Sequence, residues 1–212
     1  MEPTQAALAT MNVLRDGSLY KWYVIPLLVL TVYVYAVQIQ KRDWSVVLAG
    51  LAFWGMDWFN EIWNGLLFHF TNHAPAWGVA KDSAFIILIG LNIEICFMFA
   101  MLGVVFCMTL PPDKNSKVLG VPNRWFYAVA GSILCVIIEM MLHQAGALVW
   151  EWTWWNTGAP WLIFLLGYLP FYVVSFWVYD MPAMKKKITV VSIILGFDAL
   201  CLIVFAGFLK WI

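Results

Sequence analysis

Apolar residues run through this chain in six long segments, each interrupted by only a few polar positions. A helix needs about 20 residues to cross the hydrocarbon core of a bilayer, and the segments are about that long. They lie near residues 22–40, 44–68, 84–110, 125–150, 160–179 and 188–211. The pattern predicts an all-α, polytopic integral membrane protein. We expect a six-transmembrane-helix bundle with short loops, in which residues 1–212 form a single transmembrane domain.

Polar side chains form a stripe along the second segment. Asp57, Asn60, Glu61 and Asn64 are spaced i, i+3, i+4 and i+7, which places them on one face of a helix. Such a face must contact protein, water or a ligand rather than acyl chains. Asp57 and Glu61 lie one turn apart and would repel each other if both were ionised. We therefore expect this pair to hold at least one proton at neutral pH and to titrate as a coupled unit.

Further carboxyl groups occur in other apolar segments. Glu139 and His143 lie one turn apart in the fourth segment, where they could share a proton or could simply hold helices together. Counted at 1.5 Å per residue from the flanking loops, five carboxyl groups fall in the middle or outer half of the membrane. They are Asp57, Glu61, Glu94, Glu139 and Asp198. Because no Lys or Arg lies at that depth, they must be protonated, share protons, bind a cation or line a wet cavity. We expect Asp57, Glu61 and Glu139 to point into one cavity, with Glu94 and Asp198 on its wall.

Aromatic residues accompany these carboxyl groups. The fifth segment carries tyrosines at helical spacing, and its Pro170 should kink the helix near Gly167. A tyrosine stripe can equally be packing with tethered hydroxyls. The residues that we expect to bind a substrate are Trp54, Trp58, Asn60, Trp63, Asn64, Glu94, Tyr168 and Tyr172.

A weak internal repeat relates the second and third segments to the fourth and fifth. Glu61, Trp77 and Gly90 recur as Glu139, Trp155 and Gly167, at offsets of 78, 78 and 77 residues. Repeats of this kind are common in transporters, although three matches in so apolar a chain can arise by chance.

Composition supports the membrane assignment, because 64% of the residues are hydrophobic and only 11% are charged. Soluble domains carry about 25% charged residues. The formal net charge is zero and the few basic residues sit at segment ends, so we expect no nucleic-acid partner. The four cysteines form no CxxC pair and predict no disulfide framework.

The basic residues also predict an orientation, since Lys and Arg favour cytoplasmic loops. The first, third and fifth loops contain or adjoin Lys41, Arg42, Lys114, Lys117, Arg124, Lys185, Lys186 and Lys187. The opposite side has only Arg15, Lys21, Lys81 and Lys210. We therefore expect a multi-pass membrane protein with both termini extracytoplasmic.

No nucleotide-binding, zinc-protease or serine-hydrolase motif is present, and three interpretations stay open. The first is an intramembrane enzyme or ligand-binding protein for a lipidic, isoprenoid or other apolar small molecule. It would use cyclase-, isomerase- or hydratase-like acid/base chemistry in an aromatic-lined, outer-half cavity. Its candidate catalytic residues are Asp57, Glu61, Glu139, His143 and Asp198.

The second interpretation is a proton- or cation-coupled transporter or channel, and the third is a non-catalytic accessory subunit. The cytoplasmic halves of the segments are mostly apolar, which indicates a pocket closed at that end and favours the first interpretation. We expect membrane lipids as partners and predict no cofactor. A metal ion held by carboxylates with His69 and His73 is an alternative for which the chain has no dense ligand motif.

Overall fold

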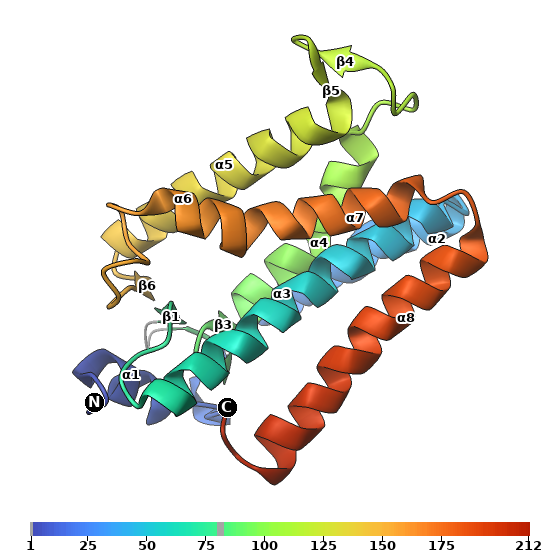
Figure 1. Cartoon of the computed structure of the whole chain (residues 1–212). Coiled ribbons are helices and arrows are strands. Elements are labelled where there is room, and N and C mark those ends of the chain that lie inside the picture. Colours follow the sequence, from blue (N-terminus) through green and yellow to red (C-terminus); the bar gives the residue numbers. More distant parts are fainter. Residues whose placement is uncertain (1, 80–82) are drawn as a thin grey trace.

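The computed structural model describes residues 2–79 and 83–212, and it is mostly helical (Figure 1). Six helical rods correspond to the six apolar segments. They are α2 (Val24–Gln40), α3 (Trp44–Thr71), α4 (Ile93–Thr109), α5 (Asn123–Gln144), the run of α6 (Pro160–Leu162), η2 (Ile163–Tyr168) and α7 (Leu169–Asp180), and the run of α8 (Met184–Cys201) and η3 (Leu202–Phe208). The helix α1 (Gln5–Met11) and the short turn η1 (Gly17–Leu19) precede them. Both η2 and η3 are π-helical.

Three short antiparallel strand pairs within the described residues join or cap the rods. They are β1 (Gly78–Val79) with β6 (Leu148–Val149), β2 (Ile86–Leu88) with β3 (Leu91–Asn92), and β4 (Lys117–Val118) with β5 (Val121–Pro122). The fold is mostly helical, as expected, although these short strand pairs were not predicted. The start of the third segment at residue 84 was wrong, since α4 begins at Ile93. The chain turns back between β2 and β3, and the side chain of Asn92 accepts a hydrogen bond from the Ile95 amide to begin α4.

Other segment ends also differ from the expectation. The fourth rod ends at Gln144 rather than near residue 150, because Gly146 adopts a positive φ of 74° and the chain then enters β6. Among the described residues, three rods are long and apolar enough to cross a membrane: α5, Pro160–Asp180 and Met184–Phe208. The apolar helices α2 and α4 have 17 residues each, or about 25 Å at 1.5 Å per residue.

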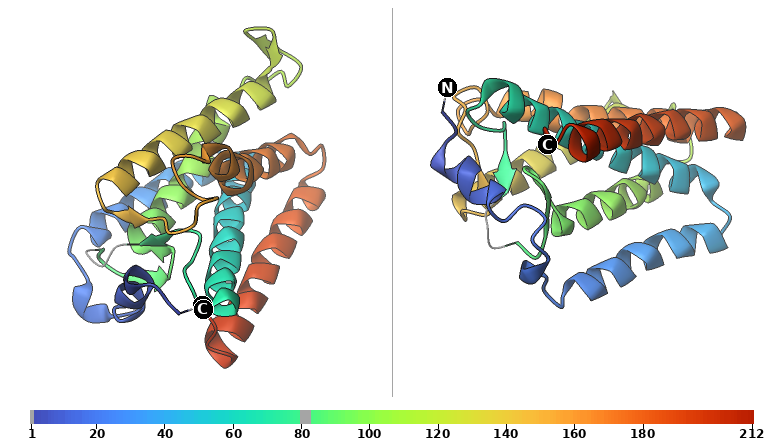
Figure 2. Two further views of the ribbon diagram at one scale, coloured as in Figure 1. Left: turned by 60° about the vertical axis from the view of Figure 1, so that its left-hand side comes forward. Right: turned by 90° about the horizontal axis from the view of Figure 1, so that it is seen from below.

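Helix α3 lies at the centre of the bundle. It packs against α4, α7 and α8, while α2 covers α4 and α5 covers α7 (Figures 1 and 2). Glycines let α3 and α4 approach closely. A Cβ atom on Gly50 would lie 2.5 Å from the Val104 side chain, and one on Gly103 would lie 2.5 Å from Cβ of Phe53.

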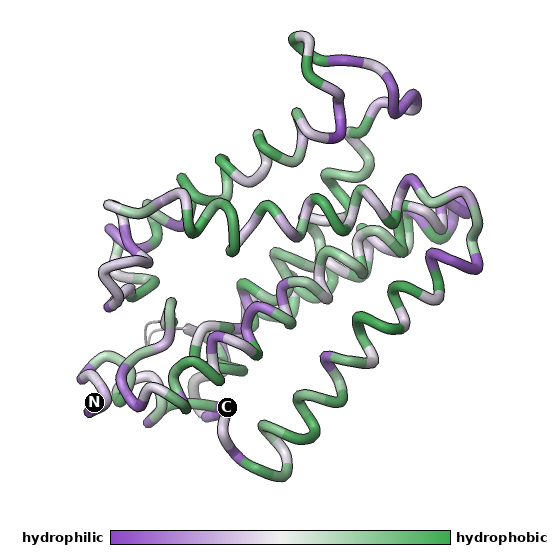
Figure 3. The backbone as a smooth tube through the Cα atoms, in the orientation of Figure 1, coloured by the Kyte–Doolittle hydropathy of each residue, from purple (hydrophilic) through white to green (hydrophobic). Residues whose placement is uncertain are grey.

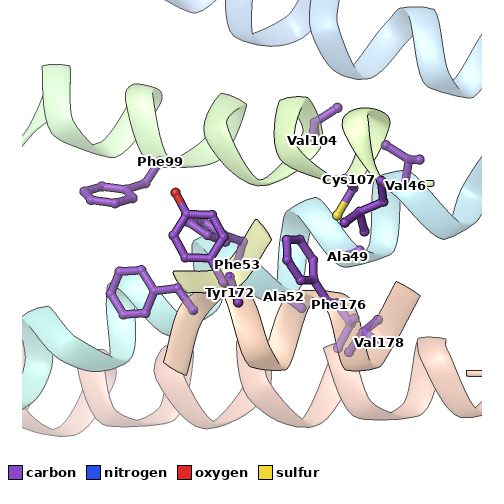
Figure 4. Close-up of a cluster of buried hydrophobic side chains, with 14 of the residues drawn as sticks. Val46, Ala49, Ala52, Phe53, Phe99, Val104, Cys107, Tyr172, Phe176 and Val178 are labelled. Carbon is purple, nitrogen blue, oxygen red and sulfur yellow. The ribbon is translucent and has the colours of Figure 1, made fainter. Parts of the chain in front are cut away.

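The main apolar core lies between α3, α4 and α7 (Figure 4). Phe53 is fully buried, and its ring meets those of Phe171 and Tyr172 edge-on, with centroids 5.5 and 4.9 Å away. Edge-to-face packing favours aromatic pairs beyond the area they bury. The central helix is therefore held by a rigid aromatic cluster next to its polar stripe.

The two ends of the bundle differ in structure. The α2–α3 turn, the β4–β5 hairpin and the α7–α8 turn lie at one end, and both termini lie at the other (Figure 1). Hydrophilic residues gather mainly at these ends, with apolar helices between them (Figure 3). At the first end, Arg124 forms an ion pair with Asp180 at 2.8 Å. Lys81, which entered the orientation argument, lies outside the described residues.

Candidate functional site

A cavity of about 100 Å³ lies between α3, α4, α5 and the η2–α7 run. Its walls are largely apolar, but three carboxyl groups line it: Asp57, Glu61 and Glu139. All three side chains are at least 95% buried. Asp57 and Glu61 of α3 and Glu139 of α5 therefore face the same cavity, as the sequence analysis led us to expect.

Glu61 is held at one oxygen only. Its Oε1 accepts a hydrogen bond of 2.9 Å from Nε1 of Trp77, which precedes β1. Its Oε2 is buried and accepts no hydrogen bond within the described part of the chain, although the Asn64 amide lies close to it. Most buried polar atoms in proteins are paired, so an unpaired carboxyl oxygen in a cavity indicates a place for a ligand or a water molecule.

The backbone of Gly90 closes in on this carboxyl group. A Cβ atom at Gly90 would lie 2.4 Å from Nδ2 of Asn64 and 2.5 Å from both Oε2 of Glu61 and Nε1 of Trp77. Only glycine fits between the three side chains. The β2–β3 turn thus forms part of the wall around Glu61.

Glu139, in contrast, is held at both oxygens. Oε1 accepts a hydrogen bond of 3.0 Å from Nε1 of Trp150, and Oε2 accepts one of 2.5 Å from the Tyr168 hydroxyl. Two donors favour the ionised carboxylate and fix its orientation. His143 does not bond to Glu139; its Nδ1 lies 3.1 Å from the Leu148 carbonyl and its ring stacks on Trp150.

The two asparagines of the first stripe hold the surrounding backbone. Pro170 cannot donate a hydrogen bond to Leu166, four residues earlier, and the helix widens into η2 just before it. The Asn60 amide donates instead to the carbonyl groups of Leu166 and Gly167, at 3.2 and 3.0 Å. Asn64 accepts from the Ala76 amide at 2.7 Å and donates to the Trp77 carbonyl at 2.8 Å, which positions the Trp77 loop.

The other two acids of the apolar segments, Glu94 and Asp198, lie away from the cavity lining. Glu94 accepts hydrogen bonds from Tyr23, Ser83 and the Ala84 amide at the end of α4 near the termini. Asp198 lies on α8 against Gly55, close enough to Asp57 to interact with it electrostatically. Neither oxygen of Asp198 accepts a hydrogen bond from the residues that the structure describes.

The aromatic wall differs from the one that the sequence suggested. The cavity is lined by Tyr168 but not by Trp54, Trp58, Trp63 or Tyr172. Trp54 and Trp58 pack against each other, and Trp63 packs behind Trp77. Phe99 and Phe171 also line the cavity, but they occupy ordinary positions of apolar helices and no pattern in the sequence marks them.

The internal repeat in the sequence includes the remaining aromatic residues of the cavity wall, Trp77 and Trp155. All six of its members line the same cavity: Glu61, Trp77, Gly90, Glu139, Trp155 and Gly167. The rings of Trp77 and Trp155 lie 5.1 Å apart, and β1 and β6, which follow the two carboxyl-bearing helices, pair with each other. The match is incomplete because Glu139 bonds to Trp150 and Tyr168. A common origin of the two halves stays a prediction.

Metal ligation was the weaker alternative for these acids. Among the described residues, no three His, Cys, Asp or Glu side chains converge as a metal site would require. His69 stacks on Trp211 and His73 packs edge-on against Trp152.

Comparisons with known proteins agree with the membrane character of the fold. A protein of Archaeoglobus fulgidus is 53% identical over 210 residues, which cover 99% of this chain and 100% of that protein. A second protein of the same organism is 49% identical over 53 residues, which cover 25% of this chain and 95% of that protein. No solved structure matches the chain. The model of a family described as an uncharacterized membrane protein family matches residues 4–207, and the chain therefore belongs to this membrane protein family.

Proposed function

We propose that this protein is an intramembrane enzyme that binds a lipidic or isoprenoid molecule and transfers a proton to or from it. The cavity lies within a bundle of apolar helices and has apolar walls, which suits a hydrocarbon ligand. The chemistry of such a ligand is limited to its few functional groups, such as a double bond or a hydroxyl. Proton transfer at these groups is the step that carboxyl side chains can catalyse.

The observation that carries the proposal is the state of Glu61. Trp77 fixes one of its oxygens, so the carboxyl group has a defined orientation. The other oxygen is buried at the cavity without a hydrogen bond from the described residues. An oriented carboxyl group with one free oxygen can give a proton to a bound ligand or take one from it.

The neighbouring groups would divide the remaining tasks. Asp57, one turn from Glu61, would exchange the proton with Glu61 between turnovers. Glu139 is held by two donors and would supply a fixed negative charge. Together with the faces of Phe99 and Trp155, this charge would stabilise a carbocation formed when an alkene is protonated. The reaction class is that of a cyclase, isomerase or hydratase.

Deuterium transfer tests this proposal even when the product is unidentified. Purified protein in nanodiscs is incubated in deuterated water with unsaturated lipids and isoprenoid alcohols, and the lipids are analysed by mass spectrometry. Acid/base catalysis at carbon should leave deuterium in the lipid. The Glu61→Gln variant should lose this incorporation, because the amide keeps the shape of the carboxyl group but has no acidic proton.

Glu94→Gln is the matched control, since it removes a helical carboxyl group that does not line the cavity. We expect it to retain incorporation. Deuterium transfer by Glu61→Gln at the wild-type rate would contradict the assignment. If the wild-type protein transfers no deuterium into any lipid class tested, the proposal of an enzyme is contradicted.

Proton-coupled transport is the second candidate, and the position of Asp198 favours it. Asp198, Asp57, Glu61 and Glu139 are electrostatic neighbours in a row from α8 to α5. Such a row can relay protons. Proteoliposomes with an internal pH dye separate the two functions, because only a transporter would dissipate an imposed pH gradient in a manner that Asp198→Asn abolishes.

We also propose that all six rods cross the membrane, with both termini outside. The Lys- and Arg-rich turns lie at one end of the bundle in Figure 1, as the orientation rule requires of a cytoplasmic face. The polar stripe of α3 is buried, so it lowers the hydropathy of this helix without meeting lipid.

A further inference from the structure

The helices α4 and α5 flank the cavity and diverge away from the β4–β5 hairpin (Figure 1). Near the β4–β5 hairpin they are close, since a Cβ atom on Gly131 would lie 2.6 Å from the Tyr172 ring and 2.9 Å from the Phe106 ring. Phe106 and Tyr172 themselves meet edge-on at 4.8 Å. Neither ring lines the cavity; the two rings fill the space between α4, α5 and α7 beyond its end.

The opposite end is closed by the strands. Val79 of β1, Leu148 of β6 and Ile86 of β2 form a buried cluster, and Ile95 of α4 and Leu142 of α5 pack against it. The β1–β6 pair thus bridges the diverging helices above the cavity. A ligand cannot enter from either end without displacing one of the two clusters.

Between these closures, the side of the cavity is bounded by Met98 and Leu102 on α4 and by Leu134 and Ile138 on α5. Leu134 is 48% exposed and Ile138 39% exposed, although both line the cavity. Helix α5 is apolar and long enough to cross a membrane. If it spans the bilayer as proposed above, its exposed side chains face acyl chains. Side chains that belong to both the cavity wall and the outer surface mark an opening.

The geometry points to a lateral window between α4 and α5 through which the hydrocarbon chain of an uncharged membrane lipid enters the cavity. This inference rests on the proposed function, since it concerns the ligand of the same cavity. It adds the entry route, the part of the ligand that binds and the requirement that the ligand is uncharged.

The volume of the cavity indicates that only part of the ligand is enclosed. Sites that surround a drug-sized ligand measure about 300–1,000 Å³, whereas this cavity measures about 100 Å³. A chain end or one functional segment fits inside, and the remainder stays in the window and the bilayer. The four described side chains that border the window are also apolar, so they offer no partner for a polar headgroup.

The carboxyl groups of the cavity indicate that the bound segment of the ligand is not anionic. The cavity holds three carboxyl groups, and none of the described residues that line it is a Lys or Arg. A phosphate or carboxylate of the ligand would meet like charge in a region of low dielectric constant. An isoprenoid or acyl chain with a hydroxyl or a double bond meets no such cost.

The window is tested with geranylgeraniol and geranylgeranyl diphosphate, which share one isoprenoid chain and differ in charge. Retention of each radiolabelled probe is measured on immobilised protein in detergent. Leu134→Trp on α5 and Leu102→Trp on α4 place an indole in the opening and should weaken retention of the alcohol by roughly tenfold or more. Ile137→Trp is the matched control on α5, since Ile137 is 49% exposed and does not line the cavity.

Three results would overturn the inference. The first is that both window variants retain the alcohol as well as the wild-type protein does. The second is that the diphosphate is retained as well as the alcohol. The third is that the window variants dissociate an oligomer, which would make the opening an interface between copies of the chain. The deuterium test keeps the two proposals separate. If the window variants bind the alcohol normally while Glu61→Gln loses deuterium transfer, the proposed window is wrong and the proposed enzyme activity still stands.

Discussion

Gly90 offers the sharpest test of the arrangement around Glu61. In a Gly90→Ala variant the new methyl carbon would lie 2.4 Å from Nδ2 of Asn64 and 2.5 Å from Oε2 of Glu61 and Nε1 of Trp77. All three contacts are shorter than a Cβ atom tolerates. The indole and the carboxyl group must therefore separate, or the β2–β3 turn must move.

The size of the effect follows from these contacts. Overpacking a buried site costs about 1–3 kcal/mol. With the unfolding entropy of globular proteins of this length, that corresponds to a decrease in Tm of roughly 2–12 °C. Loss of the 2.9 Å bond from Trp77 to Glu61 would add to this cost and would also release the carboxyl group from its orientation.

The assay compares thermal unfolding and deuterium transfer for Gly90→Ala and Gly196→Ala. A Cβ atom at Gly196, on α8, would meet nothing within 4 Å, so this substitution should leave Tm unchanged or raise it slightly. Gly90→Ala should lower Tm and reduce transfer more than its effect on the folded fraction explains. Equal Tm values and equal transfer in the two variants would refute the packing around Glu61.

Three further predictions concern stability, pairing and topology. Asn60→Ala leaves the carbonyl groups of Leu166 and Gly167 without their donor and should destabilise the protein by about 1–3 kcal/mol in thermal unfolding; an unchanged Tm would show that Asn60 does not support η2. Tyr168→Phe removes one donor to Glu139 and should shift the carboxylate bands of the infrared spectrum, whereas Tyr33→Phe, at an exposed tyrosine, should not. Reporter fusions at Lys114 and Asn156 should give opposite readouts, cytoplasmic at Lys114, and the reverse pattern would overturn the orientation.

The sequence predicted those parts of the site that depend on local spacing. Asp57, Glu61 and Glu139 face one cavity because helical periodicity places them on buried faces. The roles of Asn60 and Asn64 could not be predicted in the same way. Their partners lie on other elements, and Asn60 bonds to carbonyl groups more than 100 residues away.

The predicted helix boundaries were wrong where an apolar stretch of sequence forms a turn or a strand instead of a helix. Residues 86–92 are as apolar as a membrane span, yet they form a hairpin that brings Gly90 against Glu61. The aromatic wall was misplaced for a related reason. Trp54, Trp58 and Trp63 flank the stripe in sequence, but side chains from neighbouring helices and from the Trp77 loop occupy the space in front of it.

The central claim is that Glu61 presents an exchangeable proton to a ligand in the cavity. Infrared difference spectroscopy of the protein in nanodiscs, recorded at neutral pH upon addition of geranylgeraniol, tests it most directly. Burial and the neighbouring acid disfavour full ionisation of the Asp57–Glu61 pair. The account predicts a carboxylic acid band that shifts when the alcohol binds and is lost in Glu61→Gln but kept in Glu94→Gln. A wild-type spectrum without this band, or a band that Glu61→Gln leaves unchanged, would contradict the account.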